Sequence, residues 1–282
     1  MTRERATAFV PGHVTGFFSA HPADSPALAG SRGAGLTLTD GVDVRVTAGQ
    51  RPPEQHLNGE PATIAPVDDV LDTLGVDGTV AVETDLPVGA GFGVSGAAAL
   101  GTALAANAVA DAGRSENELV RIAHEAEVER GTGLGDVVAQ ARGGAPIRVE
   151  PGAPGHGELD GIPARARVEY VAFGERSTEA VLAEDTTALS AAGERALDRL
   201  RADPRLSTLM DASRTFAEDA DLLVPEVADA IEAVDGATDD GPGAAMAMLG
   251  RTVFALGTGL SDAGYDPAVC HTHAAGARLV EP

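Results

Sequence analysis

The sequence contains no lysine: all 20 of its basic residues are arginine. A Walker P-loop, a protein kinase of the usual type and a Schiff-base mechanism each need the amine of a lysine side chain, so these classes are excluded. Positive charge is scarce altogether, because 43 Asp and Glu residues leave a formal net charge of −23. Such a field repels nucleic acid and anionic membranes, and we expect neither as a partner.

Aromatic side chains are scarce too, at 3% of the residues. Together with the absent lysine and the excess of carboxylates, this scarcity favours a protein adapted to concentrated salt. An Arg-favouring coding background is the alternative explanation of the same composition. The two explanations differ in what they predict for the stability of the protein in dilute buffer.

We expect the melting temperature to rise between low salt and molar KCl. In dilute buffer the 43 carboxylates repel one another within one folded chain. At about 1 M salt the Debye length falls to about 3 Å, which screens that repulsion. Thermal unfolding followed by circular dichroism across this range measures the effect, and a flat melting temperature would favour the coding background.

Cysteine occurs once, at Cys270, so an intrachain disulfide is excluded and a reducing cytoplasm is the expected location. The N-terminal residues lack the apolar run of a signal peptide. Residues 86–110 are uncharged, but they begin with clustered Gly and Pro and continue mostly as Ala, which predicts a loop and a buried helix. The segment Cys270-His-Thr-His273 offers three metal-binding side chains, yet such closely spaced residues rarely converge on one ion without distant partners.

The length of 282 residues predicts two domains. The segment 151–157, rich in Gly and Pro, is the expected linker and divides the chain into 1–157 and 158–282. Asp40-Gly41, between two alternating segments, predicts a two-residue β-hairpin. Strands dominate the first part and helices the second, which indicates an α+β fold. The residue pattern predicts strands at 7–10, 34–39, 42–47, 79–83, 145–150, 168–173 and 277–280, and helices at 65–74, 95–110, 115–130, 136–142, 188–201, 207–219, 225–235 and 243–256.

The segment Gly91-Phe-Gly93-Val-Ser-Gly96 follows a predicted strand, opens a predicted helix and matches the dinucleotide-binding pattern G-x-G-x-x-G. A dinucleotide-binding fold needs a second parallel strand after that helix. Here a turn and another helix follow, so the dehydrogenase interpretation fails. The same glycines free backbone N–H groups at the positive end of the helix that contains Ser95. Such a loop cradles anionic oxygens without any lysine.

Two carboxylates downstream of this loop are candidates for metal binding and acid–base chemistry. Glu127 shares a partly apolar helix face with His124 and is therefore turned towards protein. A carboxylate there needs a cation or a donor, which makes Glu127 the candidate Mg²⁺ ligand. Asp136 follows a glycine-rich turn and begins the next helix, where an ordinary N-cap is the alternative interpretation.

The string Pro87-Val-Gly-Ala-Gly-Phe-Gly-Val-Ser-Gly-Ala97 resembles the second motif of the GHMP kinases, P-x-x-x-G-L-G-S-S-A. These are small-molecule kinases named for galactose, homoserine, mevalonate and phosphomevalonate. The turn that ends in Asp136 is similar to the family's G-x-x-S-G-x-D, shortened by one residue. Residues 9–35, 87–97 and 124–148 resemble the archaeal pantoate kinases, a branch of this family in coenzyme A synthesis. Two features depart from the pattern: the third glycine motif is not recognisable, and Arg251 stands where Asn is expected on a predicted helix.

The resemblance implies a two-domain fold, with an N-terminal domain like ribosomal protein S5 and a C-terminal α+β domain that completes the substrate site. It implies ATP and Mg²⁺ as cofactors and pantoate as the small-molecule substrate. The implied reaction is ATP-dependent phosphorylation of the terminal hydroxyl of pantoate to 4-phosphopantoate. A homodimer is compatible with it.

The resemblance also implies a role for each candidate residue. Ser95 and Glu127 hold Mg²⁺, and Asp136 binds the attacking hydroxyl, as base or as orienting group. Together these three are the expected catalytic set. Arg148 is the expected clamp for the substrate carboxylate, since a guanidinium binds a carboxylate through two hydrogen bonds. The other expected substrate-binding residues are Ser31, His124, Thr178 and His13, and the residues expected to cradle ATP are Pro87, Gly89, Gly91, Phe92, Gly93, Val94, Ser95, Gly96 and Ala97.

Two alternatives to a pantoate kinase stay open at this point. One is another GHMP kinase, acting on homoserine, shikimate or mevalonate. The other is a protein of the same fold that binds ATP or a metabolite as a sensor and catalyses nothing. The presence of Ser95, Glu127 and Asp136 favours an enzyme, because a pure binding protein does not need all three.

Overall fold

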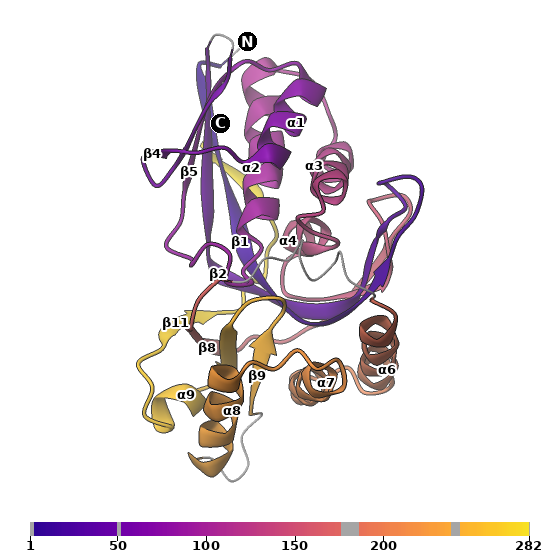
Figure 1. Ribbon diagram of the computed structural model, residues 1–282. Coiled ribbons are helices and arrows are strands. Elements are labelled where there is room, and N and C mark those ends of the chain that lie inside the picture. The colour runs from indigo at the N-terminus through magenta and orange to yellow at the C-terminus, as the bar shows by residue number, and fades with distance from the viewer. Residues whose placement is uncertain (1–2, 50–51, 176–185, 238–242, 282) are drawn as a thin grey trace.

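Two β-sheets and two groups of helices make up the computed structural model, which describes residues 3–49, 52–175, 186–237 and 243–281 (Figure 1). This mixture confirms the α+β class. The strands are β1 Arg5–His21, β2 Gly30–Ala48, β3 Glu54–Leu57, β4 Glu60–Pro61, β5 Gly78–Glu83, β6 Ala145–Glu150, β7 Glu158–Ile162, β8 Arg167–Ala172, β9 Ala244–Ala247, β10 Thr252–Leu256, β11 Ala268–His271 and β12 Arg278–Glu281. The helices are α1 Ala65–Leu74, α2 Val94–Ala110, α3 Glu116–Arg130, α4 Asp136–Arg142, α6 Thr187–Ala202, α7 Leu206–Asp219, α8 Pro225–Ala237 and α9 Gly259–Asp262.

The larger sheet has eight strands, in the order β12-β1-β2-β5-β3-β4 with β6 and β7 attached beside β2. Its longest feature is the antiparallel pair of β1 and β2, which runs from the helices at the top of Figure 1 into a curved floor beneath α4. The smaller sheet has four strands, in the order β11-β8-β10-β9, and lies below that floor. The long pair therefore contacts both halves of the molecule.

The hairpin predicted at Asp40-Gly41 is wrong. β2 continues through these residues and pairs with β1 along nearly its whole length. Gly41 lies opposite Pro11, and a Cβ at Gly41 would lie 2.4 Å from the carbonyl oxygen of Val10. The glycine is required by the close approach of two strands and not by a turn. The strand predicted at 7–10 is correspondingly much longer than expected.

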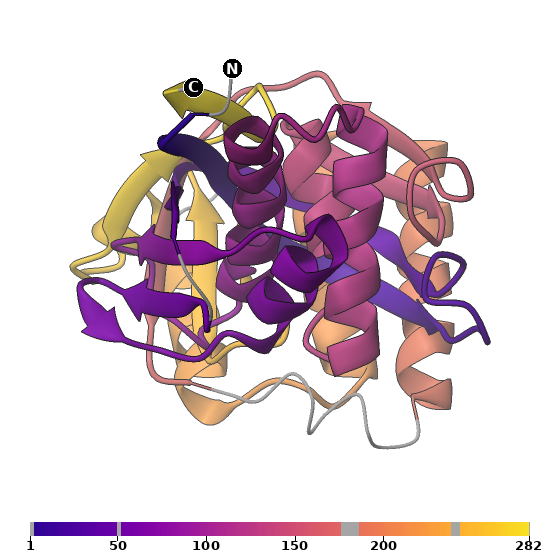
Figure 2. The same ribbon diagram turned by 90° about the horizontal axis from the view of Figure 1, so that it is seen from above.

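Helix α2 packs on one face of the larger sheet, and α1 and α3 pack against α2 and against each other (Figure 2). The Ala-rich α2 is almost entirely buried, and Gly101 lets it approach the side chain of Val44 on β2. A capping box begins α3: the Ser115 hydroxyl accepts from the backbone N–H of Glu118, and the Glu118 carboxylate accepts from the backbone N–H of Ser115. Within the described ranges, no helix has the length and apolar character that a membrane span requires.

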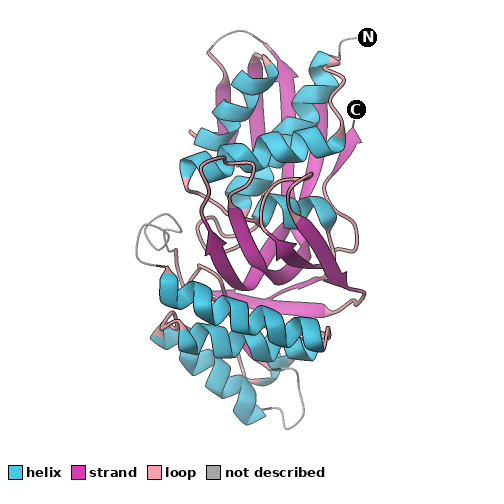
Figure 3. Ribbon diagram, turned by 90° about the vertical axis from the view of Figure 1, so that its right-hand side faces the viewer, coloured by secondary structure: helices cyan, strands magenta, loops and turns pink. Residues whose placement is uncertain are grey.

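The lower half of the molecule combines the smaller sheet with α6, α7 and α8, which pack beneath the strands (Figure 3). The helix predicted at 243–256 is wrong: β9 and β10 form an antiparallel pair joined by a turn. Distant contacts override the local helical preference of this Ala-rich segment. The backbone N–H of Met248 donates to the carbonyl of Thr15 (2.8 Å), and the hydroxyl of Thr252 donates to the carbonyl of Ala90 (2.8 Å). The Arg251 segment is therefore not helical.

The segment 151–157 connects two neighbouring strands of one sheet and is not a linker between sheets. β6 and β7, which flank it, pair antiparallel. β12, from the other end of the sequence, pairs with β1 in the same sheet. The division of the chain at residue 157 stays a prediction.

Candidate active site

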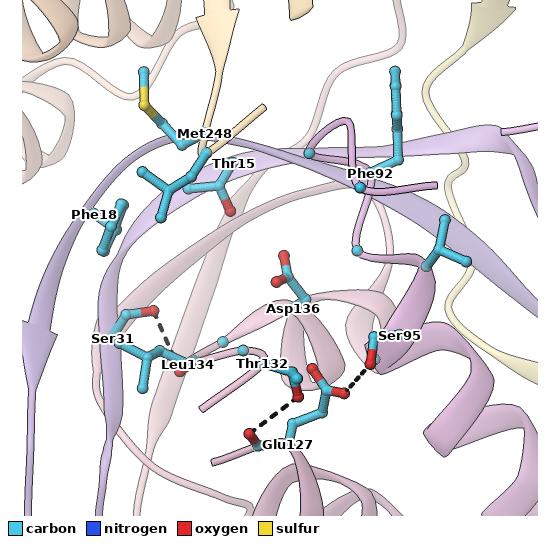
Figure 4. A pocket seen from close by; sticks show the side chains of 18 of the residues that line it. Thr15, Phe18, Ser31, Phe92, Ser95, Glu127, Thr132, Leu134, Asp136 and Met248 are labelled. Atoms are coloured by element: carbon cyan, nitrogen blue, oxygen red, sulfur yellow. Dashed lines mark hydrogen bonds between the residues drawn. The ribbon is translucent and has the colours of Figure 1, made fainter. Parts of the chain in front are cut away.

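A cavity of about 310 Å³ lies where the long β1–β2 pair passes the start of α2 and the turn between β9 and β10 (Figure 4). Segments from the whole length of the chain contribute to it. The lining residues are Thr15, Phe18, Ser31, Val88, Gly89, Gly91, Phe92, Gly93, Val94, Ser95, Gly96, Glu127, Thr132, Gly133, Leu134, Gly135, Asp136, Arg148, Met248 and Leu249.

The predicted glycine loop forms one wall of this cavity and leads directly into α2. Gly91 and Gly93 have φ of 92° and 64°, in the left-handed region that favours glycine. Gly93 is the N-cap of α2 and no side chain caps the helix, so backbone N–H groups of its first turn remain available to an anion. Phe92 anchors the loop, since its ring lies 4.7 Å from that of Tyr170 on β8. The loop is thus a preformed anion cradle at the positive end of a helix.

Ser95 and Glu127 meet beside this cradle, as the sequence predicted. The Ser95 hydroxyl donates a hydrogen bond of 2.6 Å to Oε1 of Glu127, which projects from the last turn of α3. Glu127 is only 2% exposed, and burial raises the pKa of its carboxyl to about 7 although the Ser95 hydroxyl opposes the shift. A buried carboxylate beside a hydroxyl and an anion cradle fits a hard divalent cation, which prefers oxygen ligands.

The raised pKa of Glu127 has a consequence for stability in the absence of metal. Between the unfolded value of 4.5 and the folded value of about 7, the folded protein binds a proton that the unfolded chain has released. Burial of Glu127 therefore costs more stability as pH rises. The quantity to compare is the free energy of unfolding of Glu127→Gln minus that of wild type, both in EDTA. We expect this difference to increase by roughly 2 kcal/mol in favour of the variant between pH 5 and pH 8. Urea unfolding at the two pH values measures this difference.

The matched control for that measurement is Glu129→Gln, an exposed position on the same helix. Its stability relative to wild type should not change between the two pH values. A Glu127→Gln difference that is equally independent of pH would show that the Glu127 carboxyl is already ionised in the folded protein at pH 5.

Asp136 begins α4 and lies between the Ser95–Glu127 pair and Ser31 in Figure 4. It is not a capping residue: Gly135 is the N-cap, and Asp136 Oδ1 accepts from Nδ1 of His13 at 2.7 Å. Burial opposes ionisation of Asp136, but the His13 hydrogen bond and the charge of Arg148 hold its pKa below the usual value. Burial in turn lowers the pKa of His13, so this imidazole is neutral and its Nδ1–H donates. Asp136 is therefore a carboxylate whose Oδ2 has no hydrogen-bond partner among the described residues.

Arg148 reaches the cavity from β6 and is 2% exposed. Its Nε donates to the hydroxyl of Ser31 at 3.2 Å, whereas its Nη1 is buried without a hydrogen-bond partner among the described residues. Burial lowers the pKa of Arg148 to about 10, with Asp136 opposing, so the guanidinium stays charged at neutral pH. A buried cation with an unused donor is costly unless an anion pairs with it. Arg148 and Ser31 thus form an anion site on the other side of Asp136 from Glu127.

Two of the residues predicted to bind substrate, His124 and His13, are not among those that line the cavity. His124 does not line the cavity; its Nε2 pairs with the carbonyl oxygen of Ala29 at 2.9 Å. His13 contacts Asp136 and is fully buried behind it. Thr178 lies outside the described residues.

Sequence reasoning missed the apolar lining of the cavity, which Phe18, Leu134, Met248 and Leu249 supply. Met248 and Leu249 come from the turn between β9 and β10. Their role could not be read from a segment that was expected to be helical. The pair Phe17-Phe18 in a chain with few aromatic residues was the one available signal.

The described residues contain no group of three or more His, Cys, Asp and Glu side chains that could hold a metal ion. The sequence cluster at Cys270 and His273 accordingly forms no such site. Glu127 with Ser95 offers two oxygen ligands, a set that relies on further oxygens from a bound phosphate and water, as is usual for Mg²⁺.

A family model described as "GHMP kinases N terminal domain" matches residues 64–144. Among curated proteins, the pantoate kinase of Thermococcus kodakarensis is 36% identical over 264 residues, which cover 88% of this chain and 86% of that protein. The pantoate kinase of Methanospirillum hungatei is 33% identical over 275 residues, which cover 91% of this chain and 89% of that protein.

Solved structures agree with these sequence relatives. A structure described as a phosphotransferase related to the CoA biosynthesis pathway has a TM-score of 0.86 at 30% identity and covers 98% of this chain and 99% of that chain. A homoserine kinase from Cytophaga hutchinsonii has a TM-score of 0.72 at 18% identity, with 99% and 98% covered. At that identity the second likeness shows the shared fold alone.

Proposed function

Because this chain belongs to the pantoate kinase family of the GHMP kinases and is an ATP-dependent small-molecule kinase, we propose that it phosphorylates the terminal hydroxyl of (R)-pantoate. The product is (R)-4-phosphopantoate, in coenzyme A biosynthesis. The observation that carries this choice of substrate is Arg148, a buried guanidinium with an unused donor in the same cavity as Asp136 and the glycine loop. Phosphoryl transfer depends mostly on positioning and electrostatic stabilisation, and each of these residues supplies one part of it.

The glycine loop binds the phosphates of ATP through the backbone N–H groups at the start of α2. Its geometry is held from both sides: the backbone N–H of His13 donates to the carbonyl of Phe92 (3.0 Å), and the amide of Gln140 donates to the carbonyl of Gly93 (2.9 Å). A rigid cradle loses little entropy when it binds a polyanion. This part of the site replaces the lysine that the sequence lacks.

Ser95 and Glu127 are the residues that would hold Mg²⁺. The ion, when bound, neutralises charge that develops on the transferring phosphoryl group. The Ser95 hydroxyl and the Glu127 carboxylate lie 2.6 Å apart beside the phosphate cradle, so both could ligate the same ion. Because the pKa of Glu127 is about 7, cation binding would compete with protonation of its carboxylate at neutral pH.

Asp136 accepts the hydrogen bond of the attacking hydroxyl. Its Oδ1 is fixed by the His13 imidazole, which leaves Oδ2 for the substrate, and the nearby charge of Arg148 keeps the carboxylate ionised. The Asp136 carboxylate either removes the proton of the hydroxyl or orients its oxygen. In both cases Asp136 lies between the Ser95–Glu127 pair and Arg148, so it directs the substrate hydroxyl towards phosphorus.

Arg148 and Ser31 bind the carboxylate of pantoate. The guanidinium of Arg148, which lines the cavity, would pair with this carboxylate through charge-assisted hydrogen bonds. The Ser31 hydroxyl accepts from Nε of Arg148 and donates to the carbonyl of Leu134 (3.3 Å), so it holds the guanidinium in place and would have to turn from Leu134 to donate to the substrate. His124 does not contact the substrate in this proposal. Its imidazole donates to the carbonyl oxygen of Ala29 and so holds the backbone just before Ser31 in place. Thr178, outside the described residues, remains a proposed contact from the family resemblance.

The experiment that tests this function measures ADP release and product mass with Mg-ATP and a panel of alcohols: (R)-pantoate, homoserine, mevalonate and shikimate. We expect pantoate to exceed each of the others by at least about 10-fold in kcat/KM. A different preferred alcohol would assign another GHMP kinase activity. ATP binding without turnover of any alcohol would favour the sensor.

A further inference from the structure

We propose that Phe18 and Met248 form an apolar wall of the acceptor site, and that this wall selects an alcohol acid with a branched, apolar carbon between its hydroxyl and its carboxylate. The inference rests on the proposed function and deepens it. It concerns the carbon atoms between the hydroxyl and the carboxylate of the substrate. In the proposed function Asp136 contacts only the hydroxyl, and Arg148 contacts only the carboxylate.

The acceptor occupies the half of the cavity that faces away from the phosphate cradle. In phosphoryl transfer the attacking and leaving oxygens lie on opposite sides of phosphorus, roughly in line. The Gly133–Gly135 turn separates the two halves: a Cβ at Gly133 would lie 2.5 Å from Oε2 of Glu127, and one at Gly135 would lie 2.5 Å from the hydroxyl of Ser31. The metal ligand and the carboxylate clamp are therefore on different sides of Asp136.

A row of paired residues across three strands shapes the acceptor half. Phe18 of β1 pairs with Gly33 of β2, and Gly33 pairs with Arg148 of β6. Directly paired residues place their side chains on the same face of a sheet. Neighbouring strands are about 4.8 Å apart, so Phe18 and Arg148 start from backbones separated by roughly 10 Å. Gly33 lies between them, and a Cβ there would lie 2.2 Å from the carbonyl oxygen of Phe17, so only glycine permits this pairing of β1 and β2.

The acceptor half of the cavity has chemically different walls on its two sides. Arg148 and Ser31 supply the charged and polar wall. Phe18 and Met248 supply the apolar one, and Figure 4 shows both on the far side of Asp136 from Ser95 and Glu127. An acid whose carboxylate pairs with Arg148 therefore presents its carbon skeleton to the Phe18 ring and the Met248 side chain.

Both apolar residues are packed into the wall of the cavity. Each is 6% exposed. The ring of Phe18 packs against Phe216 of α7 with centroids 5.8 Å apart, and the backbone of Met248 is bonded to Thr15 of β1. A slim acid would leave empty space between its chain and these side chains. A rigid apolar wall discriminates against missing methyl groups, because each lost contact is not replaced.

The test compares pantoate with 2,4-dihydroxybutanoate, which is pantoate without its two methyl groups. With wild-type protein and saturating Mg-ATP we expect kcat/KM to favour pantoate by at least about 10-fold, since one missing methylene in an apolar pocket costs roughly 10-fold or more. In Phe18→Leu and in Met248→Gln the values of kcat/KM for the two acids should differ by no more than about threefold. The KM for ATP should stay within about twofold of wild type in both variants.

Phe216→Leu is the matched control, because Phe216 packs behind Phe18 without lining the cavity. It loosens the same packing and should keep the preference for pantoate. Met248→Gln, which preserves side-chain length, carries the test if Phe18→Leu does not fold.

Three results would overturn the proposal that Phe18 and Met248 select pantoate. Wild type could use the two acids equally well, or both Phe18→Leu and Met248→Gln could keep the full preference for pantoate. The third result is a loss of this preference in Phe216→Leu as large as in the other two variants. If wild type phosphorylates neither acid, the proposed function itself is contradicted.

Discussion

Replacing Asp136 by Asn or Glu127 by Gln should lower kcat by at least about 10²-fold while the protein stays folded. The asparagine variant would keep the shape of the side chain but neither the charge nor the acceptor pair that orients the hydroxyl. The glutamine variant would remove the buried carboxylate at the edge of the phosphate cradle, beside Ser95. Steady-state rates with saturating Mg-ATP and pantoate measure the loss, and circular dichroism confirms folding.

Glu129→Gln is again the control, since it removes a carboxylate from the same helix without touching the cavity. Near-normal turnover in Asp136→Asn or Glu127→Gln would remove that residue from the mechanism. For Glu127 the two measurements reinforce one another: the same substitution that lowers kcat should make the metal-free protein more stable relative to wild type at pH 8 than at pH 5.

Replacing Arg148 by Ala should raise the KM for pantoate by tens-fold or more and change the KM for ATP little. A sheltered, charge-assisted pair between a guanidinium and a carboxylate is worth a few kcal/mol. The ATP phosphates are bound elsewhere, by the glycine loop, so the effect should be confined to the acceptor. Kinetics with each substrate varied in turn separate the two values of KM.

Arg148→Lys refines this measurement, because lysine keeps the charge and loses the planar, two-pronged geometry. We expect it to recover part of the pantoate affinity. His124→Ala should act in the same direction but more weakly, since His124 reaches Ser31 only through the backbone of Ala29. If Arg148→Ala weakens ATP and leaves pantoate unaffected, the carboxylate clamp is misassigned and another cation must pair with the substrate.

The parts of this site that are encoded by local signals could be predicted from the sequence. The capping box at Ser115 and Glu118, the glycines before Ser95 and the short helix at Asp136 each depend on residues within one or two turns of one another. The order of loop, Glu127 and Asp136 along the chain then indicated a phosphate site with two carboxylates. The structure brings these residues to one cavity.

Predictions that depended on distant partners were the ones that changed. At Asp40-Gly41 the sequence had the local signature of a turn, yet a paired strand about thirty residues away needed that glycine for close approach. The Ala-rich segment 243–256 is a good helix former in isolation, but its backbone groups pair with β8 and Thr15 instead, and the Thr252 hydroxyl donates to the carbonyl of Ala90. Long-range hydrogen bonds outweigh intrinsic helix propensities, which amount to less than about 1 kcal/mol for each such residue.

The sequence by itself determined the kind of chemistry. It has no lysine to bind phosphate, it has a glycine loop before a helix that can do so, and two carboxylates, Glu127 and Asp136, follow that loop. Only the tertiary structure decided the substrate half of the site. Pairing of β1, β2 and β6 placed Phe18, Gly33 and Arg148 in one row, and the turn after β9 brought Met248 to the same cavity. The physical reason is that residue type and spacing fix the local hydrogen bonds of a helix start or a glycine loop. The register between strands that are more than 100 residues apart is fixed by the packing of the whole fold.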